Sequence, residues 1–405
     1  MTSSGYLDIT LTITAEAVDN SGWATDITAG QYYIVDNESG KMMAAGHDWS
    51  TRAIVSDMGL DLTLTPDASN KIVTIDSRVS NGGDSHFFGN TVVENALWMD
   101  GSAFGWGFVA NGTGYSIYDY SSGKYVNIDA NDNLELSSTP RQFNLVSKAD
   151  MLTQLKTQMA TATTDAPVDA TLLLTAPNFN RNDLRNAEAW TVAQTLTGEG
   201  HTTNISGGEI LSGEGAGTIG NNCAEAYGTP FSFTQTITGA PAGTYQLTAQ
   251  GFYAGTGDAP NFFANGVNGA VPAKTGTEGN MTQAAQSFSV GKYAIDPIEF
   301  TVGDDGKMEI GVSGTSDAQW VIFDNFRLSY LGDPNAETEE PGHVTLAEGT
   351  VDADNWKAKV GDATEYTALP LEGVAEGTKV TLQYSGTKRV KSVTVVKKPA
   401  KEPSN

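Results

Sequence analysis

Short runs in which apolar and polar residues alternate recur along most of the chain, separated by turns rich in Gly, Asn and Asp. Residues 7–13, 244–252 and 379–384 show this alternation clearly. Because successive side chains of a β-strand point to opposite faces of a sheet, the alternation predicts strands with one buried and one exposed face. We therefore expect an all-β protein.

One stretch, residues 149–159, has the spacing of a helix rather than of a strand. Ser147 is a candidate N-cap for this helix. The residues that follow are small and rich in Thr, so residues 148–167 are predicted to be a helix and linker between two domains. The apolar side chains that form one stripe of the helix are Met151, Leu152, Leu155 and Met159.

The chain before this helix contains a weak internal repeat. Strand-like runs begin at Gln31, Lys71 and Tyr115, about 40 residues apart. Two of these runs continue into Ser-Gly-Lys turns, at residues 39–41 and 122–124, where Gly suits the positive φ of a hairpin. Three such units, each too small to bury a face alone, are predicted to pack around a pseudo-threefold axis.

Residues 28–147 resemble the ricin-B-like β-trefoil modules of secreted bacterial proteins. The resemblance rests on the sequences YYIVDNESGKMMAAG, GYSIYDYSSGKYVNI and RQFNLVS. The Gln-x-Trp of the ricin type is replaced by Arg141-Gln-Phe143, so the resemblance implies the fold rather than sugar binding by this module. Residues 1–27 contain one further strand, which either completes the trefoil or belongs to a preceding domain.

Residues 168–332 follow a different pattern, which includes APNFN near the start, PAGTY in the middle and WVIFDNFRL at the end. This order is similar to that of the jelly-roll, galactose-binding-like modules related to carbohydrate-binding modules. An acidic, Pro-bounded linker follows over residues 333–342. Residues 343–405 form a small β domain with a basic tail, and resemble spacer domains in multidomain surface proteins of gut bacteria.

The predicted fold class is therefore all-β, with a β-trefoil, a jelly-roll β-sandwich, a small C-terminal β domain and one short linking helix. The length of 405 residues agrees with two or three domains.

The charge of the chain narrows the choice of partners. With 23 Lys and Arg against 48 Asp and Glu, the net charge is −25, which argues against a nucleic-acid partner.

The single cysteine, Cys223, excludes an intrachain disulfide and a cysteine-based zinc site. No apolar run is long enough to span a membrane. Because residues 1–5 lack signal-peptide features, the chain is either cytosolic or separated from its export signal; the resemblances imply an extracellular or cell-surface location.

The sequence contains no recognisable catalytic motif. There is no Gly-x-Ser-x-Gly elbow, and no His lies near Cys223 in the sequence to activate it. The histidines are scattered and none has a companion at helical zinc-site spacing. We therefore expect no enzymatic activity. These histidines are His47, His86, His201 and His343.

The remaining function is binding. Ligand sites combine apolar and aromatic surface with a few polar groups, and the jelly-roll region has aromatic residues beside amides in loop-like stretches. We expect non-catalytic binding of a glycan or glycoprotein; the alternative is a structural or interaction module that binds protein. The candidate ligand-binding residues are Asn221, Asn222, Tyr227, Tyr253, Asn261 and Phe262.

Asp324 is a candidate metal ligand. Strand alternation places it on one face with Ile322 and Phe326, where a carboxylate is costly unless it is hydrogen-bonded or metal-bound. Jelly rolls of the resembled family often carry a structural calcium, and the resemblance implies Asp324 with Asn178 or Asn180 as its ligands. The alternative is that Asp324 accepts hydrogen bonds from backbone N–H groups of the first-strand loop.

Overall fold

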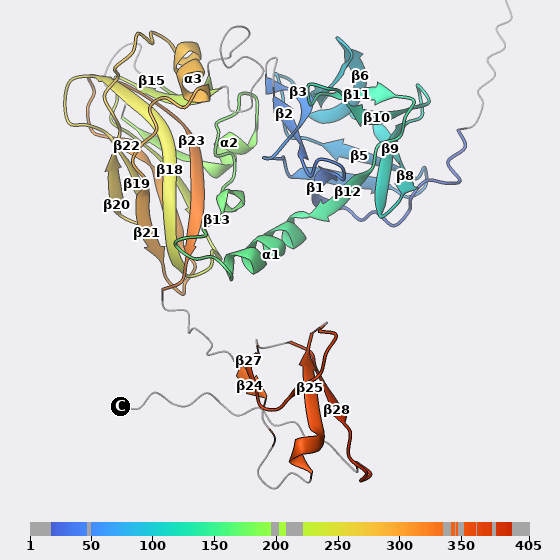
Figure 1. The fold of residues 1–405 in the computed structure, drawn as a ribbon. Coiled ribbons are helices and arrows are strands. Elements are labelled where there is room, and N and C mark those ends of the chain that lie inside the picture. The colour runs from blue at the N-terminus through green and yellow to red at the C-terminus, as the bar shows by residue number, and fades with distance from the viewer. Residues whose placement is uncertain are drawn as a thin grey trace, which may run out of the picture. The chain divides into compact units, whose positions relative to one another are not determined.

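The computed structural model describes residues 18–46, 50–195, 202–207, 222–334, 342–344, 346, 352–361, 363–374 and 378–390 (Figure 1). The chain divides into two compact units, Met1–Pro334 and Asn335–Asn405. The first unit contains the features predicted as a trefoil and a jelly roll. The second unit is the small C-terminal β region, and each unit is described by itself.

Twelve strands form the first sheet system, drawn in blue to green in Figure 1. They are β1 (Gly30–Asp36), β2 (Met42–Gly46), β3 (Arg52–Ser56), β4 (Leu62–Asp67), β5 (Ile72–Asp76), β6 (Phe87–Val93), β7 (Ala96–Gly101), β8 (Gly105–Asn111), β9 (Gly114–Asp119), β10 (Lys124–Ile128), β11 (Leu134–Ser137) and β12 (Phe143–Ser147).

Six of these strands close into a ring of antiparallel pairs in the order β1, β4, β5, β8, β9, β12 and back to β1. The others pair as three hairpins, β2 with β3, β6 with β7 and β10 with β11. A six-stranded barrel with three hairpins is the β-trefoil arrangement. The three units start at β1, β5 and β9, which confirms the repeat predicted from the sequence.

Local chemistry explains the hairpins of the repeat. The carboxylate of Asp36 accepts from the backbone N–H of Ser39 at 2.8 Å, and that of Asp119 accepts from Ser121 in the same way at 2.9 Å. The glycines of the two Ser-Gly-Lys turns have φ of 73° and 72°, as expected for hairpin turns. Each Asp therefore satisfies turn N–H groups that would otherwise lack partners.

The N-terminal segment belongs to the trefoil over the part that the structure describes. Trp23 is 8% exposed and pairs with Val109 of β8. Its indole covers Gly107, where a Cβ would come within 2.8 Å of the ring. The described residues of the 1–27 segment therefore help to cover the trefoil, whereas residues 1–17 lie outside the described residues.

The predicted linking helix is confirmed as α1 (Lys148–Met159). The Ser147 hydroxyl accepts from the backbone N–H of Asp150 at 3.0 Å, so Ser147 is the N-cap. Leu155 and Met159 are buried in the core of the sandwich that follows. The helix therefore packs against the jelly roll and does not only connect the two folds.

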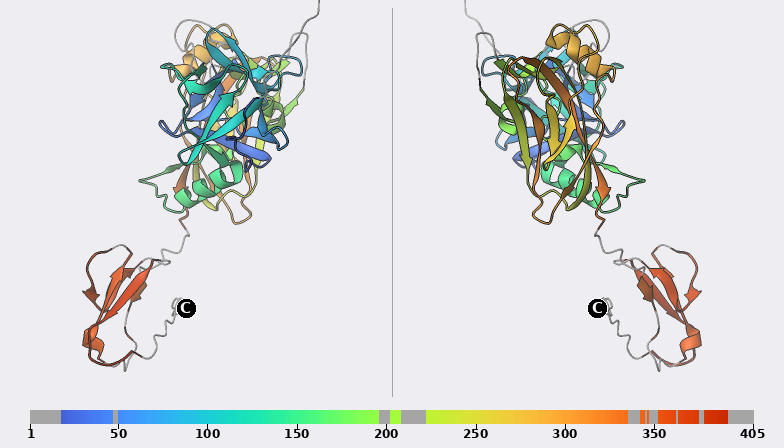
Figure 2. Two further views of the ribbon diagram at one scale, coloured as in Figure 1. Left: turned by 90° about the vertical axis from the view of Figure 1, so that its right-hand side faces the viewer. Right: turned by 90° about the vertical axis from the view of Figure 1, so that its left-hand side faces the viewer.

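Two antiparallel sheets form the jelly-roll sandwich (Figure 2). One has the order β15, β16, β23, β18, β21, with β13 beside β23, and the other has the order β14, β17, β22, β19, β20. The strands are β13 (Val168–Asp169), β14 (Thr191–Gln194), β15 (Thr202–Gly207), β16 (Cys223–Tyr227), β17 (Phe231–Ile237), β18 (Gly243–Gly255), β19 (Asn261–Ala264), β20 (Val267–Ala270), β21 (Ile298–Val302), β22 (Met308–Gly314) and β23 (Gln319–Gly332).

Two short helices in this region were not predicted. A 3-10 turn, η2 (Thr171–Leu173), precedes α2 (Arg185–Ala189), and α3 (Met281–Ser289) covers part of the outer face of the six-stranded sheet (Figure 1). Phe288 of α3 packs there against Phe252 of β18. In the described part of the chain, no helix is long and apolar enough to cross a bilayer.

The C-terminal unit contains two small sheets in its described residues. β24 (Gly342–Val344) pairs with β27 (Leu371–Val374), and β25 (Trp356–Val360) pairs with β26 (Thr367–Ala368) and β28 (Val380–Tyr384). A 3-10 turn, η3 (Ala353–Asn355), precedes β25. This agrees with the predicted small β domain, whose basic tail lies mostly outside the described residues.

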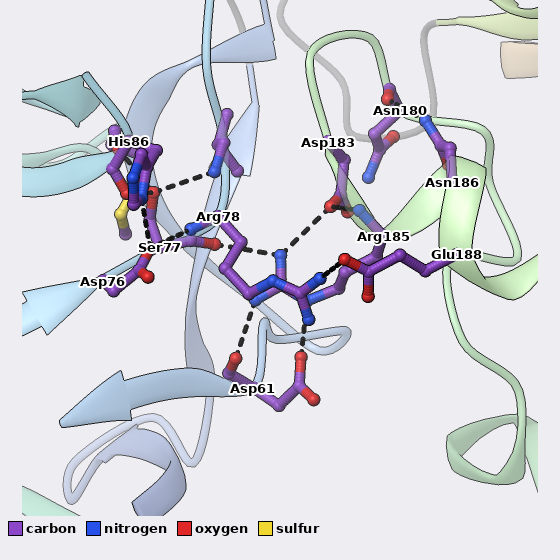
Figure 3. A network of polar contacts seen from close by, with 12 residues as sticks. Asp61, Asp76, Ser77, Arg78, His86, Asn180, Asp183, Arg185, Asn186 and Glu188 are labelled. Carbon is purple, nitrogen blue, oxygen red and sulfur yellow. Dashed lines mark hydrogen bonds and ion pairs between the residues drawn. The ribbon is translucent and has the colours of Figure 1, made fainter. Parts of the chain in front are cut away.

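A buried ion-pair network joins the trefoil to the jelly roll (Figure 3). Arg185 of α2 is 3% exposed, and its guanidinium lies between two carboxylates. Its Nε donates to Asp61 of the trefoil at 2.5 Å and its Nη1 donates to Asp183 at 3.0 Å. Further bonds go to the backbone carbonyls of Ser77 and Asp61, at 2.9 and 2.7 Å. All three charged groups are thus removed from water and depend on one another.

We expect Arg185→Met to lower the free energy of unfolding by about 3–5 kcal/mol, because it leaves Asp183 buried without a cation and Asp61 with Lys148 as its remaining partner. The matched control is Arg78→Met, which removes an ion pair with Glu188, whose side chain is 61% exposed. That change should cost below about 1 kcal/mol. Urea unfolding of both variants measures the difference. Equal losses in the two variants would contradict a stabilising role of the buried network.

Candidate functional site

The structure does not bring the predicted ligand-binding residues together at one site. Asn221 lies outside the described residues. Asn222 is fully buried, and its Oδ1 accepts from the Ser50 hydroxyl at 2.6 Å and from the Arg181 backbone N–H at 2.7 Å. Because Ser50 belongs to the trefoil, Asn222 helps to join the two folds. Its prediction as a ligand contact is corrected, since a buried amide oxygen with these two donors does not face solvent.

The prediction for Phe262 is also corrected. In β19 the ring of Phe262 turns inward, is fully buried and meets Phe326 edge to face at 5.4 Å. Its neighbour Phe263 is half-buried on the outer face, where its ring lies over Gly311 of β22. Asn261 shares this outer face. Alternation along the strand therefore gives the accessible ring to Phe263 instead of Phe262.

The two tyrosines differ in accessibility. Tyr253 packs against the sandwich core, and its backbone is bonded to Pro272 and Lys274 at 3.0 and 2.7 Å. Tyr227, at the end of β16, is 49% exposed. Of the predicted residues, Tyr227 therefore offers the most open aromatic surface.

Tyr227 lies directly opposite Trp320 of β23 in the antiparallel register. Residues opposite one another in such a pair share a face, with Cβ atoms about 4.5–5.5 Å apart. Glu225 lies on the same face two residues earlier in β16. Together with Asn204 and Lys274, these residues form what we call the Tyr227–Trp320 patch.

The indole of Trp320 is held from several sides. Its Nε1 donates to Glu225 Oε2 at 2.8 Å, and the other oxygen of Glu225 accepts from the Asn204 side chain. The Lys274 ammonium lies 5.7 Å from the indole centroid, and Phe252 meets the ring edge to face at 5.4 Å. The patch is therefore organised before any ligand arrives, which lowers the entropy cost of binding.

The segment that carries Lys274 is anchored in turn. Lys274 Nζ donates to the backbone carbonyl of Glu278 at 2.6 Å. The Glu278 carboxylate accepts from the hydroxyls of Ser287 at 2.6 Å and Tyr293 at 2.9 Å. Burial acts to raise the pKa of Glu278, but these hydrogen bonds outweigh it and the net pKa is lowered. Glu278 is therefore a stable anion that fixes this loop to α3.

Sequence reasoning missed most of this patch. Trp320 lies in the motif WVIFDNFRL, but its position opposite Tyr227 depends on the register of two strands almost 100 residues apart. Glu225 and Lys274 carry no sequence signal of their own, because single charged residues are common. Chemically, the patch offers one exposed ring, a fixed indole, a carboxylate and an ammonium group, which together suit a ligand rich in hydroxyls.

The environment of Asp324 differs from the prediction. Asn325 has a φ of 56°, and the pairing of β23 with β18 shifts register beside it. This bulge separates the faces: Asp324 lies with Ile322 on the outer side under α3, whereas Phe326 points into the sandwich core. Asp324 is fully buried, and neither carboxylate oxygen has a hydrogen-bond partner among the described residues.

The expected calcium ligands are committed to other partners. Asn178 Oδ1 accepts from Arg327 Nη1 at 2.6 Å, and the backbone carbonyl of Asn180 accepts from the Asn186 side chain at 2.7 Å. Calcium takes six to eight oxygen ligands. The described residues contain no cluster of three or more His, Cys, Asp or Glu suited to a metal. The residues present around Asp324 therefore do not fit a calcium site, and the predicted backbone donors are not found either.

Asp324 instead has the surroundings of a neutral carboxylic acid. Burial raises its pKa well above the ordinary value of 3.8, and the nearby Asn325 amide and Arg327 charge oppose this only in part. A group with a raised pKa in the folded state stabilises the fold at low pH, and this contribution is lost as the pH rises through its folded-state pKa. At neutral pH the group therefore weakens the fold.

We expect Asp324→Asn to raise the midpoint of thermal unfolding at pH 7 by at least about 2 °C and to change it little at pH 4. Asp36→Asn is the control, for which we expect the midpoint of thermal unfolding to change in the opposite direction. Although burial acts to raise its pKa, bonds from Arg141 and Ser39 lower the pKa of Asp36 to about 2, so this change should lower the midpoint at pH 7. If millimolar calcium stabilised the wild type but not Asp324→Asn, the conclusion that Asp324 is not a calcium ligand would be contradicted.

No protein-family model and no curated protein matches the sequence. Solved structures match in part. TmCBM61 in complex with β-1,4-galactotriose is 15% identical, with a TM-score of 0.20 over 34% of this chain and 86% of that chain. The enzymatically active domain of bacteriophage CBA120 tailspike protein 4 is 17% identical, with a TM-score of 0.21 over 35% and 19% of the two chains. The Bacillus thuringiensis insecticidal crystal protein Cry7Ca1 is 9% identical, with a TM-score of 0.21 over 74% and 50%. These TM-scores are too low to support an argument about fold or function.

Proposed function

We propose that this protein is a non-catalytic, extracellular or cell-surface glycan-binding protein whose jelly roll binds sugar at the Tyr227–Trp320 patch. The observation that carries the proposal is the pairing of a half-exposed Tyr227 with an indole that Glu225 and Lys274 hold in place. An aromatic ring covers the apolar C–H face of a sugar, while carboxylate and ammonium groups hydrogen-bond to its hydroxyls. The patch provides both kinds of contact on one sheet face.

The outer face of the five-stranded sheet is a second surface for the same function. Phe263 lies there over Gly311, and the neighbouring positions carry small polar side chains, among them Thr234, Ser313 and Asn261. Glu309 lies on this face two residues before Gly311, but no second aromatic ring lies opposite Phe263 in the register. We therefore rank it below the Tyr227–Trp320 patch and use Phe263 as the comparison in the binding test.

Two features favour binding over catalysis. The buried carboxylates of Asp61 and Asp183 are paired with Arg185 and Lys148, so neither is placed to act as a general acid or base. Glu225 accepts from both Trp320 and Asn204, which holds the carboxylate in place, while each oxygen can still accept one bond from a sugar hydroxyl. These carboxylates position other groups instead of facing a substrate bond. A module that binds protein instead of glycan is the competing function.

Binding to an array of plant, microbial and host glycans, followed by isothermal titration with the glycan that binds best, tests the proposal. We expect Tyr227→Ala to weaken binding by about tenfold, since loss of an aromatic contact costs roughly 1–1.5 kcal/mol. Phe263→Ala should leave the affinity unchanged. Weakening by Phe263→Ala alone would move the site to the five-stranded sheet, and the absence of any array signal would favour the protein-binding alternative.

A further inference from the structure

A cleft of about 460 Å³ lies where the trefoil, α1 and the first loop of the jelly roll meet. Its volume is within the range of about 300–1,000 Å³ that is typical of small-molecule sites. The trefoil contributes β1 and the loop before β4, and the jelly roll contributes residues 171–178. The cleft is separate from the Tyr227–Trp320 patch and shares no residue with it.

A group of aliphatic side chains forms one part of the cleft wall. Three of the side chains are methionines, which adapt to ligands of different shape. Tyr33 is the one aromatic residue among the described residues that line the cleft. Flat ring faces of the kind that stack on sugars are thus scarce, so the cleft favours a flexible aliphatic body. The main wall residues are Met42, Met58, Met151, Leu152, Leu172 and Leu173.

One end of the cleft is polar but balanced in charge. Asp61 is paired through one oxygen with Arg185 at 2.5 Å and through the other with Lys148 at 2.6 Å, and Arg185 also pairs with Asp183. Two carboxylates and two cations therefore cancel at this end. Elsewhere Asp57, Asp169 and Lys156 also line the cleft, which leaves the lining with one net negative charge. An anion is therefore disfavoured, and an uncharged polar group suits the balanced end.

Tyr33 lies at this polar end. Its side chain is 6% exposed, and no described residue forms a hydrogen bond with its hydroxyl. The hydroxyl itself is not fully buried, so it opens on the cleft and can bond to a ligand oxygen there. The neighbouring Tyr32 differs, because its hydroxyl is 2.8 Å from that of Thr28 and it does not line the cleft.

We propose that the cleft binds a small uncharged amphipathic molecule, with an aliphatic body between α1 and residues 171–174 and an alcohol or carbonyl oxygen bonded to the Tyr33 hydroxyl. This ligand class differs from the glycan of the proposed function. The cleft spans both folds, so a bound molecule would also contact both sides of the junction that Arg185 holds.

The test is a titration of the full chain with 1-hexanol, followed by ligand-observed and protein-observed NMR. We expect saturable binding of hexanol to the wild type. We expect none to Leu152→Trp, because the indole of the new side chain fills the space beside α1. Tyr33→Phe keeps the ring but removes the hydroxyl, and should weaken binding by about five- to tenfold. The matched control Tyr32→Phe should bind as the wild type does.

Several outcomes would overturn the inference. These are the absence of saturable hexanol binding, unchanged binding in Leu152→Trp, unchanged binding in Tyr33→Phe, or competition of galactose with hexanol. Binding of hexanoate or hexylamine as tightly as hexanol would show that charge is tolerated, and would overturn the uncharged class. Tyr227→Ala should leave hexanol binding unchanged. Loss of glycan binding in that variant therefore tests the glycan proposal independently of the cleft.

Discussion

The buried guanidinium of Arg185 is the contact on which the arrangement of the first unit depends. It lies between an Asp of the trefoil and an Asp of the jelly roll, and all three groups are buried. If the two folds separated, all of these charged groups would be exposed to water or would lose their ion-pair partners. The same junction uses the buried amide of Asn222, bonded to Ser50. Two modules that look independent in the sequence are therefore joined by polar contacts that work only when both are folded.

The cleft lies beside this junction, since Asp61, Asp183 and Arg185 all line it. The linking helix α1 covers part of that space, with Leu155 and Met159 in the sandwich core and Met151 and Leu152 on the cleft side. One helix thus packs against the jelly roll and supplies one wall of a cavity. The apolar stripe of the helix serves both purposes.

On the sandwich surface, strand register decides which groups can meet a ligand. Tyr227 and Trp320 are neighbours only because β16 pairs with β23, and Phe263 is accessible because alternation turns Phe262 inward. The bulge at Asn325 has the opposite consequence for Asp324, which it places under α3 without a hydrogen-bond donor. Single-residue shifts along a strand therefore separate a surface group from a buried one.

Local pattern was sufficient for the all-β class, for the threefold repeat of the barrel and for α1 with its Ser147 cap, because alternation, turn chemistry and helical spacing are properties of neighbouring residues. It was not sufficient for the surroundings of Asp324, for the pairing of Tyr227 with Trp320 or for the role of Asn222. Those depend on a bulge, on a register and on a contact between distant segments. Such features arise when whole sheets pack, so no window of the chain contains the information that decides them.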